Sequence, residues 1–384
     1  MIPEQFRENS MFRTFLPTMA ALSLGVSTLL FTDTATAQIP LTLPETVTIA
    51  LGANDPSVSL LEQQALAFED RAIADSQLPD PTLRAGIANF PLSSFDYNRE
   101  AMTQLKFGLT QRLPKGQTLS LIREKREAQA QGVRAQKELR EKQIVRQARL
   151  AWLELYYWRD ARRLTRESQK KVEELGGVAQ SVYASGRSSL QDVLRVELET
   201  AALGTKLIDI DRNEDMARAN LERLIGRVEG SRELAVLFPV LPAIGSEDAI
   251  RDRLAYHPSI KVYDAGVVTK SRDVAIAAEQ YKPGFSFDVG YGLRDSRSDF
   301  GSIGVSVTLP LFSRKNKDYA LSAAKRMRAS QKLARDAQTL ELERSLRREW
   351  AQYVRYGERI VLYETDVLDR AKETRDAAMI AYGN

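Results

Sequence analysis

The sequence FSFDVGYGL occupies residues 285–293 and alternates apolar side chains with small or polar ones. Residues 302–311 and 102–113 show the same alternation, and residues 82–92 show a weaker form of it. Each segment therefore predicts a β-strand with one apolar and one polar face. The segments are about ten residues long, which is the length of a tilted strand that crosses a lipid bilayer. Many polar-face residues are Gly or Ser, which would leave room for a water-filled lumen.

Four such strands cannot close a barrel, because even the smallest membrane barrels need about eight. An open sheet edge is not tolerated in lipid, since its backbone N–H and C=O groups find no partners there. If the strands span a membrane, several chains must share one barrel, and three chains of four strands would supply twelve. An ordinary soluble antiparallel sheet with one wet face shows the same alternation and is the alternative.

A very long helix is predicted from about Thr118 to Tyr183, where proline is absent and good helix formers dominate. At about 1.5 Å per residue it spans roughly 100 Å, more than the diameter of a single domain. A turn is expected at residues 184–188, and then a return helix over residues 190–225 that ends at Gly226. The pair Gly176-Gly177 is expected to loosen the first helix. Apolar positions at helical spacing predict a packed face rather than a cofactor site: Ile144, Ala148, Ala151, Leu155 and Trp158.

The two halves of the chain repeat one order of elements at an offset of about 200 residues. Asp55-Pro56-Ser57 opens a segment in the first half, and His257-Pro258-Ser259 opens its counterpart. Trp152 likewise matches Trp350. Each half is expected to contain a helix, two strands and a very long helix, in that order. A period of this length indicates a duplicated domain rather than a solenoid.

The N-terminal segment predicts export. Arg13 precedes an apolar stretch from Ala20 to Phe31, and Ala35-Thr36-Ala37 places small residues where an export peptidase reads them. A signal peptide cleaved near Ala37 is therefore predicted, and an uncleaved membrane anchor is the alternative. The predicted organisation is a signal peptide at 1–37, a first repeat at 38–226, a linker at 227–246 and a second repeat at 247–384.

Composition excludes several kinds of chemistry. The 384 residues include no Cys and one His, His257, so neither a thiolate site nor a His-rich zinc site can form. Lys and Arg number 55 against 51 Asp and Glu with the signs interspersed, which argues against a nucleic-acid partner. His257 precedes Pro258 at the position that Asp55 holds in the first half, so it is interpreted as a helix start rather than a catalytic base. No enzyme activity is expected.

The chain resembles the TolC-like outer-membrane efflux proteins, the outer-membrane factors of tripartite efflux systems. The resemblance rests on the duplicated order of elements, on the long hairpin, and on residues 78–81 (LPDP), 99–104 (REAMTQ), 183–187 (YASGR) and 221–226 (LERLIG). It implies a mainly α-helical fold with membrane β-strands, in which three chains join a twelve-stranded outer-membrane barrel to a periplasmic helical tunnel. It implies a passive exit duct that meets a periplasmic adaptor and an inner-membrane pump, with no cofactor and no metal. The family's substrates include drugs, metal ions and polypeptides, so the substrate stays open.

The resemblance also implies that the turn of the hairpin is the periplasmic tip that meets the adaptor. The residues carried to the tip are Tyr183, Gly186, Arg187, Ser188 and Leu190, with Tyr382 and Gly383 at a second tip. A role of Gly186 and Ser188 in the turn alone is the alternative. Asp192 is expected to suit the dipole of the return helix near its start. The second interpretation of Asp192 is an acid at the pore entrance that attracts cations.

The family pattern continues with a second return helix, whereas this sequence stops at Asn384. By symmetry with residues 190–225, about 36 residues of helix would be absent. The chain is therefore expected to be a C-terminally truncated member of the family. A periplasmic structural coiled-coil protein and a truncated channel fragment without function are the alternatives.

Overall fold

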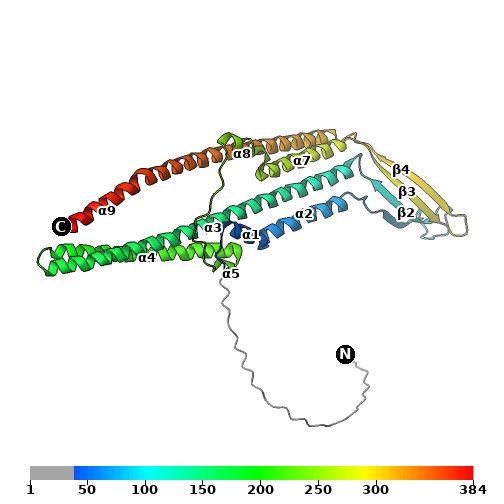
Figure 1. Cartoon of the computed structure of the whole chain (residues 1–384). Coiled ribbons are helices and arrows are strands. Elements are labelled where there is room, and N and C mark those ends of the chain that lie inside the picture. Colours follow the sequence, from blue (N-terminus) through cyan, green and yellow to red (C-terminus); the bar gives the residue numbers. More distant parts are fainter. Residues whose placement is uncertain (1–38, 384) are drawn as a thin grey trace, which may run out of the picture. The chain divides into compact units, whose positions relative to one another are not determined.

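The computed structural model describes residues 39–383, so the predicted signal peptide lies outside the described residues. Most of its elements are labelled in Figure 1. The helices are α1 (Leu43–Gly52), α2 (Pro56–Ala74), α3 (Thr118–Ala184), α4 (Leu190–Ile225), α5 (Arg227–Gly230), α6 (Glu247–Arg251), α7 (Pro258–Glu279), α8 (Arg314–Leu362) and α9 (Leu368–Gly383). The strands are β1 (Thr82–Ala88), β2 (Gln104–Leu113), β3 (Gly284–Leu293) and β4 (Phe300–Thr308). A 3₁₀ turn, Leu254–Tyr256, precedes α7, and a π-helical turn, Tyr363–Val367, joins α8 to α9.

Both halves of the described chain show the predicted order, with α2, β1, β2 and α3 followed later by α7, β3, β4 and α8. The helices α2 and α7 also begin alike. The carboxylate of Asp55 accepts a hydrogen bond from the N–H of Ser57 at 2.8 Å, and Nδ1 of His257 accepts one from the N–H of Ser259 at 3.2 Å. His257 is thus a helix cap, as predicted. The contacts of Pro40–Asn384 form one unit, and the boundaries of the two repeats and the linker stay a prediction.

The helices α3 and α4 form the long hairpin that the sequence predicts, and Figure 1 shows them running side by side. They contain 67 and 36 residues, and the predicted bounds agree with the structure to within one residue. Gly176 and Gly177 do not interrupt α3, and the loosening predicted there stays a prediction. A glycine costs a helix only about 1 kcal/mol, and strong helix formers flank this pair.

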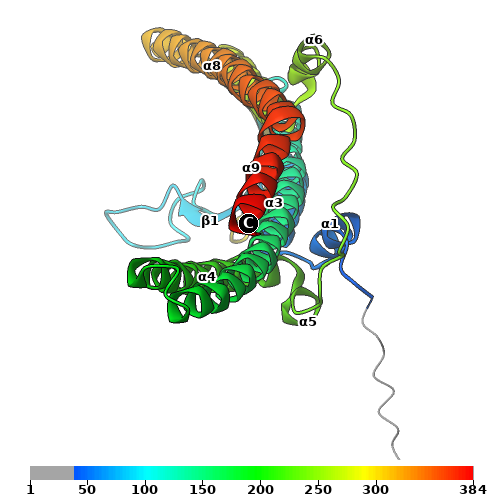
Figure 2. The same ribbon diagram turned by 60° about the vertical axis from the view of Figure 1, so that its left-hand side comes forward.

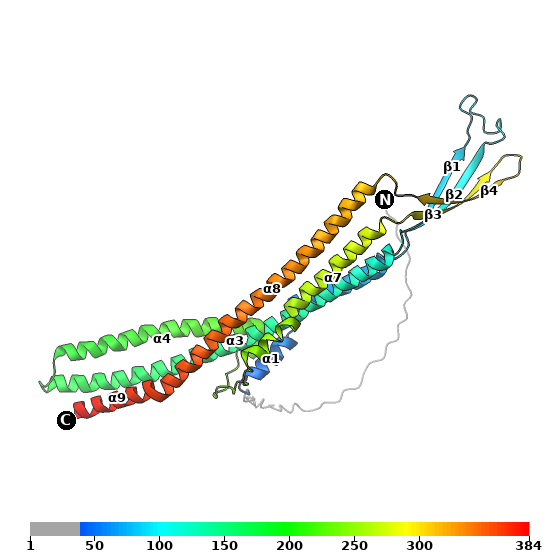
Figure 3. The ribbon, with the colours of Figure 1, turned by 90° about the horizontal axis from the view of Figure 1, so that it is seen from above.

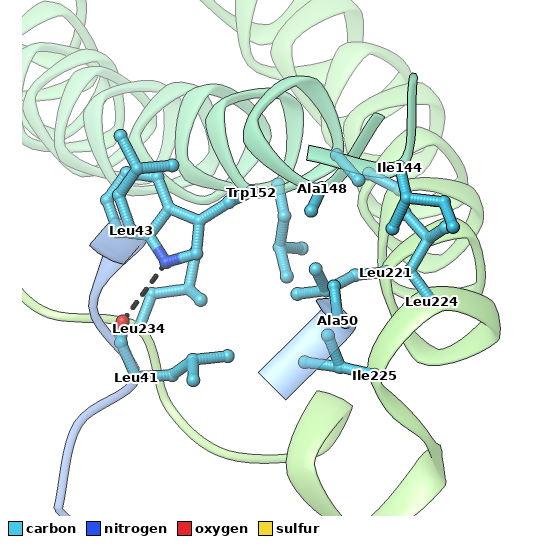
Figure 4. Packing of buried hydrophobic residues seen from close by; sticks show 13 residues of the cluster. Leu41, Leu43, Ala50, Ile144, Ala148, Trp152, Leu221, Leu224, Ile225 and Leu234 are labelled. Atoms are coloured by element: carbon cyan, nitrogen blue, oxygen red, sulfur yellow. Dashed lines mark hydrogen bonds between the residues drawn. The ribbon is translucent and has the colours of Figure 1, made fainter. Parts of the chain in front are cut away.

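Trp152 of α3 lies in the main hydrophobic core, which α1 and α4 complete (Figure 4). Its side chain is 1% exposed, and its indole N–H donates a hydrogen bond to the carbonyl of Leu41 at 3.1 Å. Leu41 pairs with Leu234 in a parallel bridge, so the segments before α1 and after α5 are fastened together beside the hairpin. The predicted positions Ile144, Ala148, Ala151 and Leu155 are buried in this core, and Trp158 is partly buried against it.

Other helices pack along α3. It contacts α2, α4 and α7, and α7 in turn contacts α8; Figure 2 shows α4 beside α3. Ion pairs cross these contacts, since Lys137 Nζ lies 2.7 Å from Glu62 Oε2 on α2 and Lys261 Nζ of α7 lies 2.8 Å from Glu138 Oε2. Both pairs are partly exposed and add little to stability, so the apolar contacts carry the packing.

The four strands form one antiparallel sheet in the order β1-β2-β3-β4, seen at one end of the helices in Figure 3. Pairing of β2 with β3 joins the two halves and places Thr110 opposite Asp288. Three predicted strand ranges are wrong at their ends, and β2 begins at Gln104, two residues later than predicted. The strand β1 stops before Asn89, whose φ of 55° does not fit an extended strand. The strand β4 begins two residues earlier than predicted and ends before Pro310, which has no N–H for the ladder.

Candidate functional site

The strand register gives the sheet one apolar face and one mostly polar face, as the alternation predicts. On β3, Phe285, Phe287, Val289, Tyr291 and Leu293 lie on one face, and their cross-strand partners on β2 are also mostly apolar. On the other face Ser286, Asp288, Gly290 and Gly292 pair with residues such as Arg112, Thr110 and Lys106. Within the four strands, no charged residue lies on the apolar face.

The apolar face and the two outer strands lack cover in the described chain. Leu83 on β1 is 71% exposed and Ile303 on β4 is 87% exposed, although both side chains are large and apolar. Among the described strands, β1 pairs only with β2 and β4 pairs only with β3, so one edge of each is open. A sheet of this kind fits a hydrocarbon surrounding only when further strands close it.

Asp288 is the carboxylate of the polar face and is held by hydroxyl groups. Thr110 Oγ1 donates to its Oδ1 at 2.6 Å, and Ser306 Oγ donates to its Oδ2 at 3.2 Å. Arg84 and Lys106 lie on the same face. The alternation in the sequence predicted a small, polar face, and its charged members were not among the predicted site residues. Their odd or even position within each strand fixes the face on which they lie, and it was the sequence signal that could have identified them.

Tyr97 is a second residue that sequence analysis missed, and it fastens the loop between β1 and β2 to the sheet. Its hydroxyl donates to the carbonyl of Leu293 at 3.1 Å and accepts from the N–H of Leu105 at 3.0 Å. In the same region the side chain of Asn89 donates to the carbonyl of Met102 at 3.0 Å. No local pattern marks the Tyr97 contact, because one partner lies 196 residues away in the chain.

The turn between α3 and α4 closes through Gly186. Its φ is 72°, in the left-handed region that residues with a Cβ rarely adopt. The N–H of Gly186 donates to the carbonyl of Tyr183 at 2.9 Å, and the N–H of Arg187 donates to the carbonyl of Val182 at 3.1 Å. The last carbonyls of α3 are therefore satisfied within the turn. A turn role for Gly186 follows directly from its backbone.

Ser189 and Asp192 form a capping box at the start of α4. The N–H of Asp192 donates to Ser189 Oγ at 3.4 Å, and the N–H of Ser189 donates to Asp192 Oδ2 at 3.2 Å. The hydroxyl of Ser188 donates to the same carboxylate at 2.8 Å. The hydrogen bonds from Ser188 and Ser189 hold the pKa of the Asp192 carboxyl below its usual value. Asp192 thus stabilises the helix start, and its place at a pore entrance stays a prediction.

Several predicted tip residues present their side chains to solvent around this turn. Tyr183 is 43% exposed, Leu190 is 51% exposed, and Arg187 is exposed as well. They leave an apolar and cationic surface at the end of the hairpin. Tyr382 and Gly383 belong to the last described turn of α9, and their place at a second tip stays a prediction.

The described residues contain no group of three or more His, Asp or Glu side chains that could hold a metal ion. Within residues 39–383, no helix is both long and apolar enough to cross a membrane.

Solved structures with a similar fold include outer-membrane proteins. The outer-membrane channel OprN matches with a TM-score of 0.71 at 16% identity, over 89% of this chain and 80% of its own. The CmeC outer-membrane channel of Campylobacter jejuni matches with a TM-score of 0.67 at 13% identity, over 87% of this chain and 76% of its own. The outer-membrane protein VceC of Vibrio cholerae matches with a TM-score of 0.63 at 15% identity, over 89% of this chain and 83% of its own. No protein-family model and no curated protein sequence matches the chain.

The chain therefore has the fold of the TolC-like outer-membrane channels, which combines long helical hairpins with a four-stranded antiparallel sheet. The long helical hairpin and the four antiparallel strands that the sequence resemblance implies are confirmed, and the twelve-stranded barrel of three chains stays a prediction.

Proposed function

We propose that the chain is the outer-membrane channel subunit of a tripartite efflux system, and that it acts as a passive exit duct. The observation that carries this proposal is the sheet, which is apolar on one face, mostly polar on the other and open at both edges. Three copies would bring β1 of one chain beside β4 of the next and close a twelve-stranded barrel. The apolar face then meets lipid and the polar face lines the lumen.

The proposed location is the outer membrane, with the helices extending into the periplasm after cleavage of the signal peptide near Ala37. The order of elements supports this arrangement, because α3 leaves the sheet directly after β2 and runs 67 residues to the turn. A helix of that length covers about 100 Å at 1.5 Å per residue, so its turn lies far from the sheet.

The turn between α3 and α4 is the proposed contact for a periplasmic adaptor. An inner-membrane pump would complete the efflux system. Exposed Tyr183, Arg187 and Leu190 support this, since aromatic residues and arginine are enriched at protein interfaces. Gly186 and Ser188 shape the turn that presents them. Tyr382 and Gly383 are proposed to take the equivalent place in the second half. No cofactor takes part in this proposed role.

Membrane fractionation of the native protein, followed by native mass measurement in mild detergent, tests the proposal. We expect the protein in the outer-membrane fraction, soluble only with detergent, at three times the mass of the mature chain. A monomer that is soluble in buffer without detergent would contradict the channel function and favour a periplasmic structural coiled-coil protein.

A further inference from the structure

The polar face of the sheet carries an uneven set of charges. Arg84 lies on β1, Lys106 and Arg112 lie on β2, and Asp288 lies on β3, all on this face by the strand register. Three cations against one carboxylate give the polar face of the four strands a net charge of +2 in each chain. In the trimer of the proposed function, three copies would place about six net positive charges around one lumen.

The charges near the middle of the sheet surround one hollow. Arg84, Lys106, Asp288 and Ser302 all line this hollow, which has a volume of about 400 Å³. Gly290 forms part of its floor. A Cβ at Gly290 would lie 2.5 Å from Ser302 Oγ and 3.5 Å from Lys106 Cε, so the glycine leaves room for Ser302 beside the lysine.

The cations of this face have no carboxylate partner among the described residues. The one carboxylate of the face, Asp288, is hydrogen-bonded to hydroxyl groups instead. Asp288 accepts hydrogen bonds from Thr110 and Ser306 and makes no ion pair with the cations of this face. No ion pair in the described part of the chain includes Arg84, Lys106 or Arg112. Their positive charges are therefore available to a solute that passes along the polar face.

We infer that the polar face of this sheet forms an anion-favouring lumen, with Lys106 and Arg84 as the side chains that set the preference. The inference rests on the proposed function, because it needs the polar face to line an aqueous passage. Low-dielectric walls focus the field of fixed charges into such a passage and raise the local concentration of counter-ions. Anionic solutes would thus be enriched over cationic solutes of the same size.

Single cysteines provide the test, because the natural chain has none. Ser302→Cys places a thiol in the hollow beside Lys106, and Val305→Cys places one on the apolar face of the same strand. The full-length variants are reconstituted in phosphatidylcholine vesicles. They are treated with an anionic or a cationic methanethiosulfonate. The cysteine thiolate takes up the charged alkylthio group of the reagent as a mixed disulfide, and methanesulfinate leaves. The increase in intact mass over time gives the rate of modification by each reagent. Each rate is divided by the rate at which the same reagent modifies a free thiol in solution.

We expect the Ser302→Cys protein to react faster with the anionic than with the cationic reagent after this normalisation. Adding Lys106→Gln should lower that ratio by about three-fold to ten-fold, from the Coulomb energy of one charge at several ångströms in water. Lys106→Arg keeps the charge and should leave the ratio unchanged. Lys106 is exposed in the single chain, so these changes leave the packing intact.

Two results would count against this account in different ways. A Ser302→Cys protein that reacts much faster than Val305→Cys but shows no anionic preference, or no effect of Lys106→Gln, overturns the inference and leaves the channel standing. Equal reactivity of Ser302→Cys and Val305→Cys in vesicles would show that the two faces do not divide lumen from lipid, and it would overturn the proposed function together with the inference.

Discussion

Single residues decide the geometry of the hairpin turn, and two glycines in the same helix–turn unit differ in what they do. Gly186 has a φ of 72°, whereas Gly177 lies inside α3 with open space where a Cβ would be. The sequence alone predicted the turn at Gly186 correctly, because glycine followed by hydroxyl residues commonly ends one helix and starts another. It could not show that α3 continues unbroken through Gly177.

Substitution of these two glycines by alanine should have opposite effects on stability. Gly186→Ala forces a Cβ into the left-handed region and should lower the free energy of unfolding by about 1 kcal/mol. Gly177→Ala should raise it by about 0.5 kcal/mol, because alanine is the better helix former and nothing obstructs its Cβ. Chemical denaturation followed by circular dichroism measures both. A destabilising Gly177→Ala would contradict the helix described there.

The capping box predicts a pH dependence at the start of α4. The folded-state pKa of Asp192 is held below its ordinary value of 3.8 by hydrogen bonds from Ser188 and Ser189. The stabilisation is therefore fully present above pH 3.8 and is lost as the pH falls through the lowered folded-state pKa. The difference in melting temperature between the natural protein and Asp192→Asn should shrink over that acidic range. A difference that stays constant into strong acid would show that the carboxylate charge is not involved.

At the scale of elements, helices were more predictable than strands. The bounds of α3 and α4 followed from composition and from the turn residues, since those signals are local. The end of β1 was missed because it depends on the positive φ of Asn89, which its contact with Met102 supports. The contact of Trp152 with Leu41 was also hidden from local reasoning, because 111 residues separate the two.

The same helix offers a matched test of the core. Leu155 of α3 is fully buried, whereas Leu150 on the same helix is 52% exposed. Leu155→Ala should lower the free energy of unfolding by about 2–5 kcal/mol, from lost burial and the cavity left behind. Leu150→Ala should change it by less than about 0.5 kcal/mol. Urea unfolding of the two variants under the same conditions checks this, and equal losses would contradict the described core.

At the scale of the whole molecule, the alternation of four short segments was enough to predict one sheet with two unlike faces. The pairing order could not be read from any strand alone, because β2 and β3 belong to different halves of the chain. The strand register shows that Arg84, Lys106 and Asp288 lie on one face of the assembled sheet, which therefore carries net positive charge. The alternation within one strand can be read from the sequence, but the residues that lie opposite one another on neighbouring strands cannot.

The central claim is that β1 of one chain pairs with β4 of another to close a membrane barrel. Single cysteines on β1 (Leu83, Ala85 or Ile87) combined with single cysteines on β4 (Ile303, Val305 or Val307) test it, since the natural chain has no competing thiol.

Within one chain these positions are three strand spacings apart, about 14 Å, which is too far for a disulfide. Oxidation of the protein in its membrane should therefore give covalent dimers and trimers, and nothing larger, at the pairs that are in register. Monomers alone at every pair would contradict the account.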